Sequence, residues 1–333
     1  MEQKYFVFYV FMVIFAFNKI IRMDVSIIII NYRTAGLIVN CINSIIKFTK
    51  DVSYEIIVVD NNSMDNCEKT LLSLFPRENI VFLGLNQNIG FGRANNKGFE
   101  IAKGRNVFCL NPDTLLLNNA VKELSDYLDG HEDVGVCGGN LYDEELRPMH
   151  SFVRYFPSLA WSLHMLTFRK TERLIYGKNS EFNHSGHTLT VAYVTGADLM
   201  IKKELLTRFG GYSPDFFMYY EETDLCYRIR SKGYKVVSVP TAKIQHLEGR
   251  SFDKEKNVVN DKRIRMMEES RSIYYKRNVG TVQTIISNNI YHAALLLNKF
   301  VFKMFKREIW KNYEYRLLYF KELNKRNKQT VNR

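Results

Sequence analysis

Four short runs of valine, isoleucine and other apolar residues constrain the fold of this chain more than any other feature. They lie at 25–30, 54–60, 79–84 and 106–111, and segments with helical character follow them near 36–48, 66–75, 92–103 and 118–129. Continuous apolar runs that alternate with helices are typical of parallel strands buried on both faces. The 333 residues therefore predict an α/β fold, in one large domain or two small ones, with a mostly parallel sheet covered by helices.

Each of the four apolar runs ends in a polar stretch. These ends read NYR (31–33), DNNS (60–63), LNQNIGFGRANN (85–96) and NPD (111–113). Asparagine and aspartate favour turns, which accounts for part of the pattern. Ligands of parallel sheets, however, bind beyond the carboxyl ends of the strands. Because all four ends are polar, we expect a ligand site at this edge of the sheet.

The chain changes character after about residue 133. A glycine-rich stretch, VGVCGGNLYD (134–143), has an extended pattern, and residues 147–190 are aromatic and basic with little periodicity. We interpret 147–190 as an insertion that contributes to a pocket. A strand within 189–201, a helix from about Lys203, an acidic helix and a strand near 235–240 follow, and the remainder from about 252 is predicted to be helical.

The stretch FFMYYEETDLCYRIR (216–230) places three carboxylates directly after apolar residues. Acidic residues favour the first turn of a helix. Helical spacing predicts that Asp224 and Arg228 pair on a solvent-exposed face. The same spacing puts Glu222 on an inward face, together with the apolar positions 225, 226 and 229. A buried carboxylate is costly unless it has a partner or a function, and from this stretch alone both remain open.

The five cysteines and the histidine pair of HSGH (184–187) give no metal-binding pattern. The cysteines are odd in number and lack a C-x-x-C motif, so we expect buried thiols in a reducing compartment. The HSGH stretch is interpreted as a loop without a metal.

Residues 1–23 form an apolar N-terminal segment. Its core, 5–17, has 13 uncharged residues, fewer than the roughly 20 that a spanning helix needs, and no signal-peptide cleavage site follows. Two interpretations remain: a membrane anchor, or an upstream extension with Met23 as the true start.

The C-terminal tail is strongly basic. Residues 299–333 contain eleven Lys or Arg and three Glu, a net +8 of the total +12, interleaved with large apolar residues. A basic tail suits nucleic acid or an anionic membrane. The apolar residues favour a helix lying on a membrane, with no nucleic-acid partner; the alternative is a C-terminal helix docked on the domain.

Six stretches in order resemble glycosyltransferase family 2, and most of all its bacterial rhamnosyltransferase-type members. They are VSIIIINYR, EIIVVDNNSMD, LNQNIGFGRANNKG, FCLNPDTLL, the segment from VTGADLM to RSKGY, and IQHLEGRS, and they cover roughly residues 24–278. The resemblance implies a GT-A fold, a Rossmann-like sheet that binds a nucleotide-sugar in residues 24–133. Residues 134–278 would then form the acceptor and catalytic half, and 279–333 the basic amphipathic tail.

The resemblance also implies a donor site on the strand ends. Asp60 would accept a hydrogen bond from a base or a ribose hydroxyl, or else only cap its turn. Arg93 would reach a phosphate, or else lie on the surface. The expected donor-binding residues are Asn31, Tyr32, Asp60, Asn62, Asn88, Gly90, Phe91, Arg93, Asn96 and Asn111.

The stretch NPD matches the metal-binding D-x-D of the family, with Asn111 in place of the first acid. Asp113 keeps the second acid, and one or two carboxylates with substrate phosphates suffice for Mg²⁺. His246 matches a histidine that helps to hold the metal in some members, and imidazole suits Mn²⁺ better. The cofactor is thus expected to be Mg²⁺ or Mn²⁺.

The stretch EETDLCYR matches the E-D-x-D-L-C-x-R of the family. Glu222 takes the place of the catalytic base, which is usually Asp, while Glu221 and Asp224 would orient the acceptor or the helix. Residues of the segment that lines the acceptor and sugar pocket are Gly196, Ala197 and Asp198.

The resemblance implies an inverting sugar transfer. We expect rhamnose from dTDP-rhamnose, with UDP-sugars as alternatives. The expected acceptor is a polyprenyl-diphosphate-linked saccharide of surface polysaccharide or O-antigen synthesis, at the inner face of the cell membrane. One alternative, a sugar-phosphate nucleotidyltransferase, has no need of a base on an acidic helix. The other, a non-enzymatic basic membrane or nucleic-acid binder, leaves Asp60, Asp113 and Glu222 unexplained.

Overall fold

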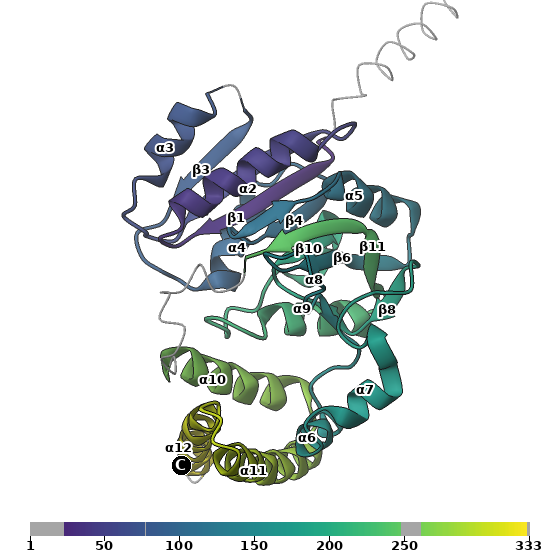
Figure 1. The fold of residues 1–333 in the computed structure, drawn as a ribbon. Coiled ribbons are helices and arrows are strands. Elements are labelled where there is room, and N and C mark those ends of the chain that lie inside the picture. Colours follow the sequence, from purple (N-terminus) through teal and green to yellow (C-terminus); the bar gives the residue numbers. More distant parts are fainter. Residues whose placement is uncertain (1–22, 77, 248–260, 332–333) are drawn as a thin grey trace, which may run out of the picture.

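A mixed sheet runs through the centre of the molecule (Figure 1). This computed structural model describes residues 23–331 except 77 and 248–260, so the segment 5–17 and the last letters of IQHLEGRS lie outside the described residues. The strand order is β3-β2-β1-β4-β10-β6-β11-β5, with β8 paired to β11. The strands are β1 (Val25–Asn31), β2 (Tyr54–Asp60), β3 (Ile80–Gly84), β4 (Asn106–Leu110), β5 (Thr114–Leu116), β6 (Val134–Tyr142), β8 (Leu189–Val191), β10 (Asp198–Lys202) and β11 (Lys235–His246).

The first four strands are parallel, as the apolar runs predict. β1 pairs in parallel with β2 and β4, and β2 pairs in parallel with β3, whereas β10 runs antiparallel to β4 and β6. The α/β class and the helix-covered, mostly parallel sheet are therefore confirmed. The single strand expected within 189–201 is instead three short strands, β8, β9 (Tyr193–Val194) and β10, because the chain bends at Ala192 and turns again at residues 195–197.

Helices cover both faces of the sheet. On β1, Ile27 and Ile29 pack under α2 (Ala35–Phe48), α3 (Cys67–Leu74) and α5 (Ala120–Gly130). Ile28 and Ile30 point the other way, toward α4 (Phe91–Ile101), α8 (Lys203–Phe209) and α9 (Glu221–Ser231). This alternation is what period-2 geometry requires of a strand buried on both sides. All five cysteines are buried free thiols, as expected.

The insertion and the C-terminal helices form a second layer below α9 (Figure 1). The insertion contains β7 (Phe152–Val153), which pairs with β9, then α6 (Leu159–Leu166), α7 (Lys170–Tyr176) and the short 3-10 helix η1 (Gly177–Asn179). The C-terminal part contains α10 (Asp261–Asn278), α11 (Thr281–Met304) and α12 (Trp310–Val331).

The C-terminal helices pack on the rest of the chain. Leu317 and Phe320 of α12 are buried against Tyr291 and Leu295 of α11, and Trp161 of α6 covers the same cluster. The inner side of the tail is thus docked on protein, the alternative that the sequence left open. Among the described residues, none of the helices combines the length and the apolar character that a membrane crossing requires.

Candidate active site

The end of β1 is a closed hydrogen-bond network. Asn31 is fully buried and donates from Nδ2 to Asp60 (2.8 Å) and Asp65 (3.0 Å). Its Oδ1 accepts from both the backbone N–H and the hydroxyl of Thr34. The amide therefore uses both donors and both lone pairs on protein. Asn31 therefore connects the loop after β1 to the loop after β2. These contacts give no support to the expected contact with a nucleobase.

Asp60 combines a structural contact with capacity for a ligand. Its Oδ1 accepts from Asn31 and its Oδ2 from the backbone N–H of Ser63 at 3.2 Å, so it does cap its turn. The side chain is nevertheless partly exposed, and each carboxylate oxygen retains a further lone pair. Tyr32 at the end of β1 is 41% exposed, and Asn62 has the left-handed φ of 63°. Asp60 and Tyr32 are therefore accessible to a ligand at this end of the sheet.

Two residues that sequence reasoning missed hold these loops together. Asp65 accepts from Asn31 and, through Oδ2, from the backbone N–H of Ala35 at the start of α2 (3.1 Å). Asn61 donates to Asn88 (3.0 Å) and accepts from the backbone N–H of Ile89 (2.9 Å). Both lie in the polar stretch after β2, which was the only signal that could have identified them.

The loop before α4 fits closely against the segment that leads into α9. Gly90 has φ of 89°, and a Cβ there would lie 2.3 Å from the carbonyl oxygen of Phe217, so only glycine is accommodated. Asn88 accepts from the N–H of Gly90, and the N–H of Phe91 donates to the same carbonyl of Phe217 at 3.0 Å. The loop before α4 and the segment that leads into α9 are thus one packed unit.

Two expected donor-binding residues prove to hold this unit together. Arg93 donates from Nε to the carbonyl of Pro214 at 2.8 Å. Asn96 donates to the carbonyl of Tyr212 and accepts from its N–H, both at 2.8 Å. Their side chains are committed to the segment 212–217, so the phosphate contact expected of Arg93 has no support in this geometry. The sequence could not show this, because these partners lie more than 110 positions away.

Asp113 and His246 meet where β5 pairs with the end of β11. In the strand register, His246 lies opposite Thr114, the neighbour of Asp113. Nε2 of His246 lies 3.3 Å from Oδ1 of Asp113. The side chain of His246 is 13% exposed and that of Asp113 is 4% exposed. Asn111, the replaced acid, is partly exposed and donates its backbone N–H to the carbonyl of Ala197 at 2.9 Å.

This pair fits a divalent metal as a partial ligand set. A carboxylate oxygen suits Mg²⁺ and an imidazole nitrogen suits Mn²⁺. Within the described residues, no group of three or more His, Cys, Asp or Glu side chains forms a metal site by itself. Asp113 and His246 would therefore hold an ion only together with oxygens from a donor diphosphate or from water.

The turn at residues 195–197 connects this pair to the acidic helix. A Cβ at Gly196 would lie 3.7 Å from the ring of Phe91 and 3.9 Å from the side chain of Glu222. Ala197 follows and carries the carbonyl that accepts from Asn111. Gly196 therefore lies between the donor-side loop and the acidic helix, where an acceptor pocket is expected.

Asp198 has a different role from its neighbours. The carboxyl is fully buried, and its two oxygens accept from the N–H of Gly139 (2.6 Å) and the hydroxyl of Thr195 (3.3 Å). Burial raises the pKa of Asp198 to about 7. These contacts fasten β10 to β6 and give no support to a direct acceptor contact by Asp198.

Two adjacent carboxylates open α9. Glu221 is buried, and burial together with the charge of Glu222 raises the pKa of Glu221 well above its ordinary range. Its Oε2 has no hydrogen-bond partner within the described part of the chain. Glu222 is partly exposed, and burial raises its pKa as well, opposed in part by a hydrogen bond from the Thr223 hydroxyl at 3.1 Å and by His150. The helix thus presents one accessible carboxylate with raised basicity.

The residues just before this pair adopt an uncommon backbone. Tyr219 and Tyr220 have φ of 70° and 67°, which is rare for bulky side chains. Ser270 of α10 donates to the carbonyl of Met218 at 2.7 Å, and Phe216 packs against Tyr274. The surrounding structure therefore fixes the start of α9 at some conformational cost, a common feature of active sites.

The solvent-exposed face predicted for Asp224 and Arg228 is wrong. The pair does form, at 2.8 Å, but Asp224 is completely buried and also accepts from Asn278 (2.9 Å) and contacts Arg277 (3.3 Å). Helix α10 covers this side of α9, and nothing in the local sequence announced it. Of the inward face predicted for Glu222 together with Leu225, Cys226 and Ile229, the three apolar residues are fully buried, whereas Glu222 is partly exposed.

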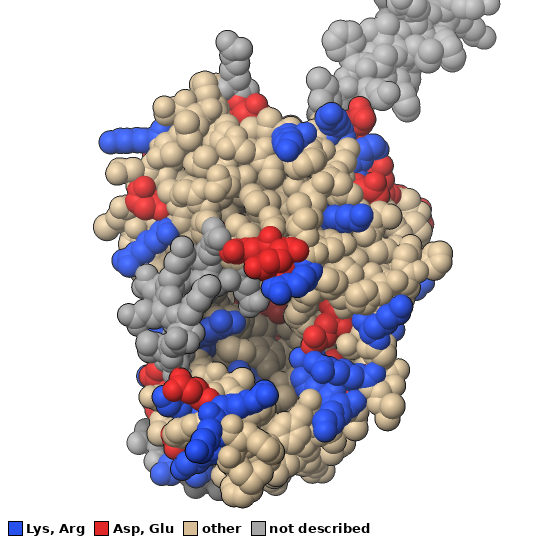
Figure 2. All heavy atoms as spheres, in the orientation of Figure 1, with Lys and Arg blue, Asp and Glu red and all other residues tan. Residues whose placement is uncertain are grey.

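A hollow lies between the layer that holds α9 and the C-terminal helices, with basic side chains gathered near its lower rim (Figure 2).

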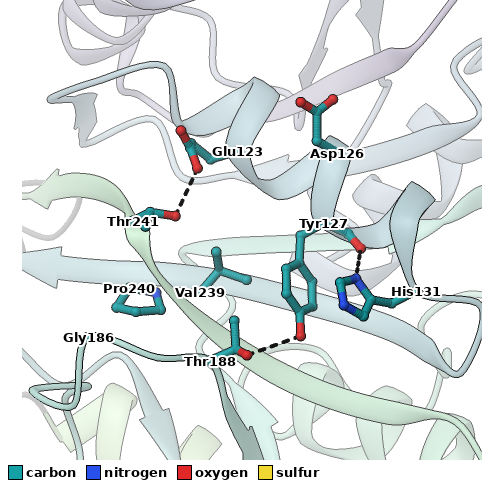
Figure 3. A pocket seen from close by; sticks show the side chains of 9 residues that line it. All are labelled: Glu123, Asp126, Tyr127, His131, Gly186, Thr188, Val239, Pro240 and Thr241. Atoms are coloured by element: carbon teal, nitrogen blue, oxygen red, sulfur yellow. Dashed lines mark hydrogen bonds between the residues drawn. The ribbon is translucent and has the colours of Figure 1, made fainter.

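A separate cavity of about 380 Å³ opens on the side of α5 and β11 (Figure 3). There, Tyr127 stacks on His131 and donates to Thr188, next to the loop that contains HSGH. None of the expected site residues lines this second cavity.

Comparison with known proteins agrees with this geometry. Residues 26–190 match the family described as Glycosyl transferase family 2. A low-salt glycan biosynthesis hexosyltransferase, Agl10, of Haloferax volcanii is 24% identical over 217 residues, 64% of each chain. An N-acetylglucosaminyl-diphospho-decaprenol L-rhamnosyltransferase of Mycobacterium tuberculosis is 23% identical over 222 residues, 59% of this chain and 67% of the relative. The matches span about two thirds of the length of these relatives.

Solved structures share the fold. A mannosyltransferase from Pyrobaculum calidifontis, in complex with GDP-Man and Mn²⁺, has a TM-score of 0.56 at 16% identity and covers 90% of this chain and 85% of its own. GalNAc-T7 with UDP, GalNAc and Mn²⁺ also has a TM-score of 0.56, at 14% identity, over 76% of this chain and 48% of its own. Residues 26–190 thus match a glycosyltransferase family 2 domain, and the chain shares the fold of these solved glycosyltransferases.

Proposed function

We propose that this protein is an inverting glycosyltransferase that moves a sugar from a nucleoside-diphosphate donor to a hydroxyl of a saccharide acceptor. The observation that carries the proposal is the position of Glu222. It lies beside Gly196, whose neighbour Ala197 bonds to Asn111, two residues before Asp113. An accessible carboxylate of raised pKa therefore stands next to the segment that carries the candidate metal-binding acid.

Glu222 acts as the general base in this proposal. Its raised pKa is nearer to neutral pH, where a base works best. It takes the proton from the acceptor hydroxyl while that oxygen bonds to the anomeric carbon, and the bond from this carbon to the donor diphosphate breaks. Attack opposite the leaving group inverts the anomeric configuration. Glu221 is buried, and burial together with the charge of Glu222 raises its pKa well above the ordinary range of a glutamate, which favours its neutral form beside an ionised Glu222.

Asp113 and His246 are proposed to hold Mg²⁺ or Mn²⁺ together with the donor. When bound, such an ion offsets the charge that develops on the leaving diphosphate. Two observations support this: the 3.3 Å approach of the two side chains, and the Mn²⁺ present in both solved neighbours. The same neighbours contain GDP-Man or UDP, which supports a nucleotide-sugar donor.

Rhamnose from dTDP-rhamnose is the proposed donor sugar, and a polyprenyl-diphosphate-linked saccharide is the proposed acceptor. The mycobacterial relative supports both, because its name specifies rhamnosyl transfer to N-acetylglucosaminyl-diphospho-decaprenol. The haloarchaeal relative is named a hexosyltransferase, so other hexoses remain alternative donor sugars. We therefore include UDP-sugars in the donor screen. A role in surface polysaccharide or O-antigen synthesis, at the inner face of the cell membrane, completes the proposal.

A thermal-stability screen tests the donor. A ligand that binds only the folded protein raises its melting temperature by mass action. We expect one nucleotide-sugar, dTDP-rhamnose first, to stabilise the protein with Mn²⁺ or Mg²⁺ and to lose this effect with EDTA. Product analysis with an oligosaccharide acceptor should then show release of nucleoside diphosphate. Release of pyrophosphate would instead indicate a nucleotidyltransferase, and no stabilisation by any nucleotide-sugar would contradict the donor site.

A further inference from the structure

Helix α11 has an unusual composition for a helix on the outside of a protein. Residues 281–298 contain no Asp, Glu, Lys or Arg. One side of the helix is buried, where Tyr291 and Leu295 pack on α12 and α6. The opposite side exposes large apolar side chains that are each 41–70% accessible: Val282, Ile285, Ile286, Leu297, Phe300 and Met304.

These six residues lie along one side of the helix, three near each end, with the exposed Asn289 and Ala293 between them; we call this stripe the α11 face. At about 100° per residue they fall within an arc of about 120°, opposite the buried side of the helix. A helix of 24 residues rises about 36 Å, so the stripe is about as long as a small domain is wide. Large apolar patches on a solvent-exposed surface mark sites of interaction with a protein or a membrane.

The charge around the α11 face identifies the partner. Residues 261–333 contain seventeen Lys or Arg against six Asp or Glu, so this part of the chain carries +11 of the total +12. Lys303, Lys306 and Arg307 are exposed at the C-terminal end of the stripe. A second copy of the chain would bring two such positive units together, whereas an anionic bilayer complements them.

We propose that the α11 face lies on an anionic lipid bilayer, with its apolar side chains in the acyl boundary and the basic residues on the headgroups. This deepens the proposed function, on which it rests for the lipid-linked acceptor. Within the predicted tail, 279–333, Leu317 and Phe320 of α12 are buried, so α11 and the turn at Phe305 supply the surface.

Site-specific labelling of the full-length protein tests the contact. All five native cysteines are buried, so a fluorophore attached to Phe300→Cys reports on that position alone. Leu72→Cys on α3, 63% exposed at the opposite end of the molecule, is the matched control. The protein is mixed with phosphatidylglycerol–phosphatidylcholine vesicles that carry nitroxide-labelled lipid.

We expect the protein to float with these vesicles and not with pure phosphatidylcholine, and added salt to reduce binding. The label at 300 should be quenched and the label at 72 should not. Failure to float with anionic vesicles, or a bound protein whose label at 300 stays bright, would overturn the proposal.

Replacement of the apolar contact gives an independent measure. Phe300→Glu should lower partition onto anionic vesicles about tenfold or more, since a buried phenylalanine contributes about 1.5–3 kcal/mol, whereas Leu72→Glu should change it little. If Phe300→Glu instead converts a dimer to a monomer with unchanged partition, the face joins two copies and the proposal fails. Vesicle binding needs no donor, so its outcome is independent of whether sugar transfer is found.

Discussion

The strand-end region and the start of α9 are both rich in Asn, Asp and Glu, yet the side chains of the two regions differ in how their polar atoms are paired. At the strand ends, Asn31, Asn61 and Asn96 satisfy their hydrogen-bonding groups on neighbouring loops. At the start of α9, two adjacent carboxylates share one small region, and both have raised pKa values. The presence of a polar residue in a motif therefore does not tell whether its role is structural or catalytic. Whether its polar atoms already have hydrogen-bond partners in the protein is the more useful criterion.

The largest effect is expected from Glu222→Gln. This change keeps the shape of the side chain and removes the base, which typically contributes about 10²–10⁴-fold in rate. Turnover should fall by about that factor, and donor affinity should stay near wild type because the proposed nucleotide site lies at the strand ends. Steady-state kinetics and donor titration measure the two quantities separately.

Glu221→Gln is the matched control for this change. Glu221 is already biased toward its neutral form, so an uncharged amide should reduce turnover far less. Normal turnover in Glu222→Gln together with an inactive Glu221→Gln would show that the base is the buried member of the pair.

Asp224→Asn should destabilise the folded state rather than remove a catalytic group. Removal of one partner of a buried ion pair typically costs about 3–5 kcal/mol, and Asp224 serves both Arg228 and Arg277. Chemical denaturation should show this loss, and the surviving folded protein should keep its KM for the donor. Wild-type stability with lost activity would instead place Asp224 in direct contact with substrate.

Asp113→Asn tests the metal-binding side of the comparison. We expect the folded protein to lose most of the gain in donor affinity that Mn²⁺ or Mg²⁺ provides, because a charged ligand is replaced by a neutral amide. Asn111→Asp, which restores the second acid, should raise metal affinity instead. Donor titrations with and without EDTA measure both, and equal affinities of the Asp113→Asn protein in both conditions would remove Asp113 from the site.

The sequence predicted the elements well where the signal was local. The positions of β1–β4 and α2–α5 follow from apolar runs of strand length and from helical spacing between them. The environment of Asp224 could not be predicted, because Asn278 lies 54 positions away and α10 had no sequence signal for docking there. For the same reason the sequence does not show the contacts of Arg93 and Asn96, whose partners in 212–214 become neighbours only in the folded chain.

Asn96→Ala should have a moderate effect and only on stability. It removes two hydrogen bonds to the backbone of Tyr212 and leaves those groups without partners, at about 1–3 kcal/mol. Lys97→Ala, on the same helix but in an exposed pair with Glu100, is the control and should cost less than about 0.5 kcal/mol. Thermal unfolding compares the two. A large loss of donor affinity in Asn96→Ala, with stability unchanged, would return Asn96 to the donor site.

The smallest effect concerns the pH profile of the carboxylate pair. Because Glu222 must be ionised to act as the base, kcat/KM should fall on acidification through its pKa, and burial places this limb above the ordinary range of a glutamate. Burial and the charge of Glu222 raise the pKa of Glu221 well above its ordinary range, so we expect Glu222 to ionise beside a neutral neighbour. Glu221→Gln should therefore move the acid limb by less than about half a pH unit. A profile of kcat/KM against pH for both proteins decides the matter. If the limb moved down by more than about one unit, Glu221 would be charged in the working enzyme. The pair would then share its proton in the reverse order.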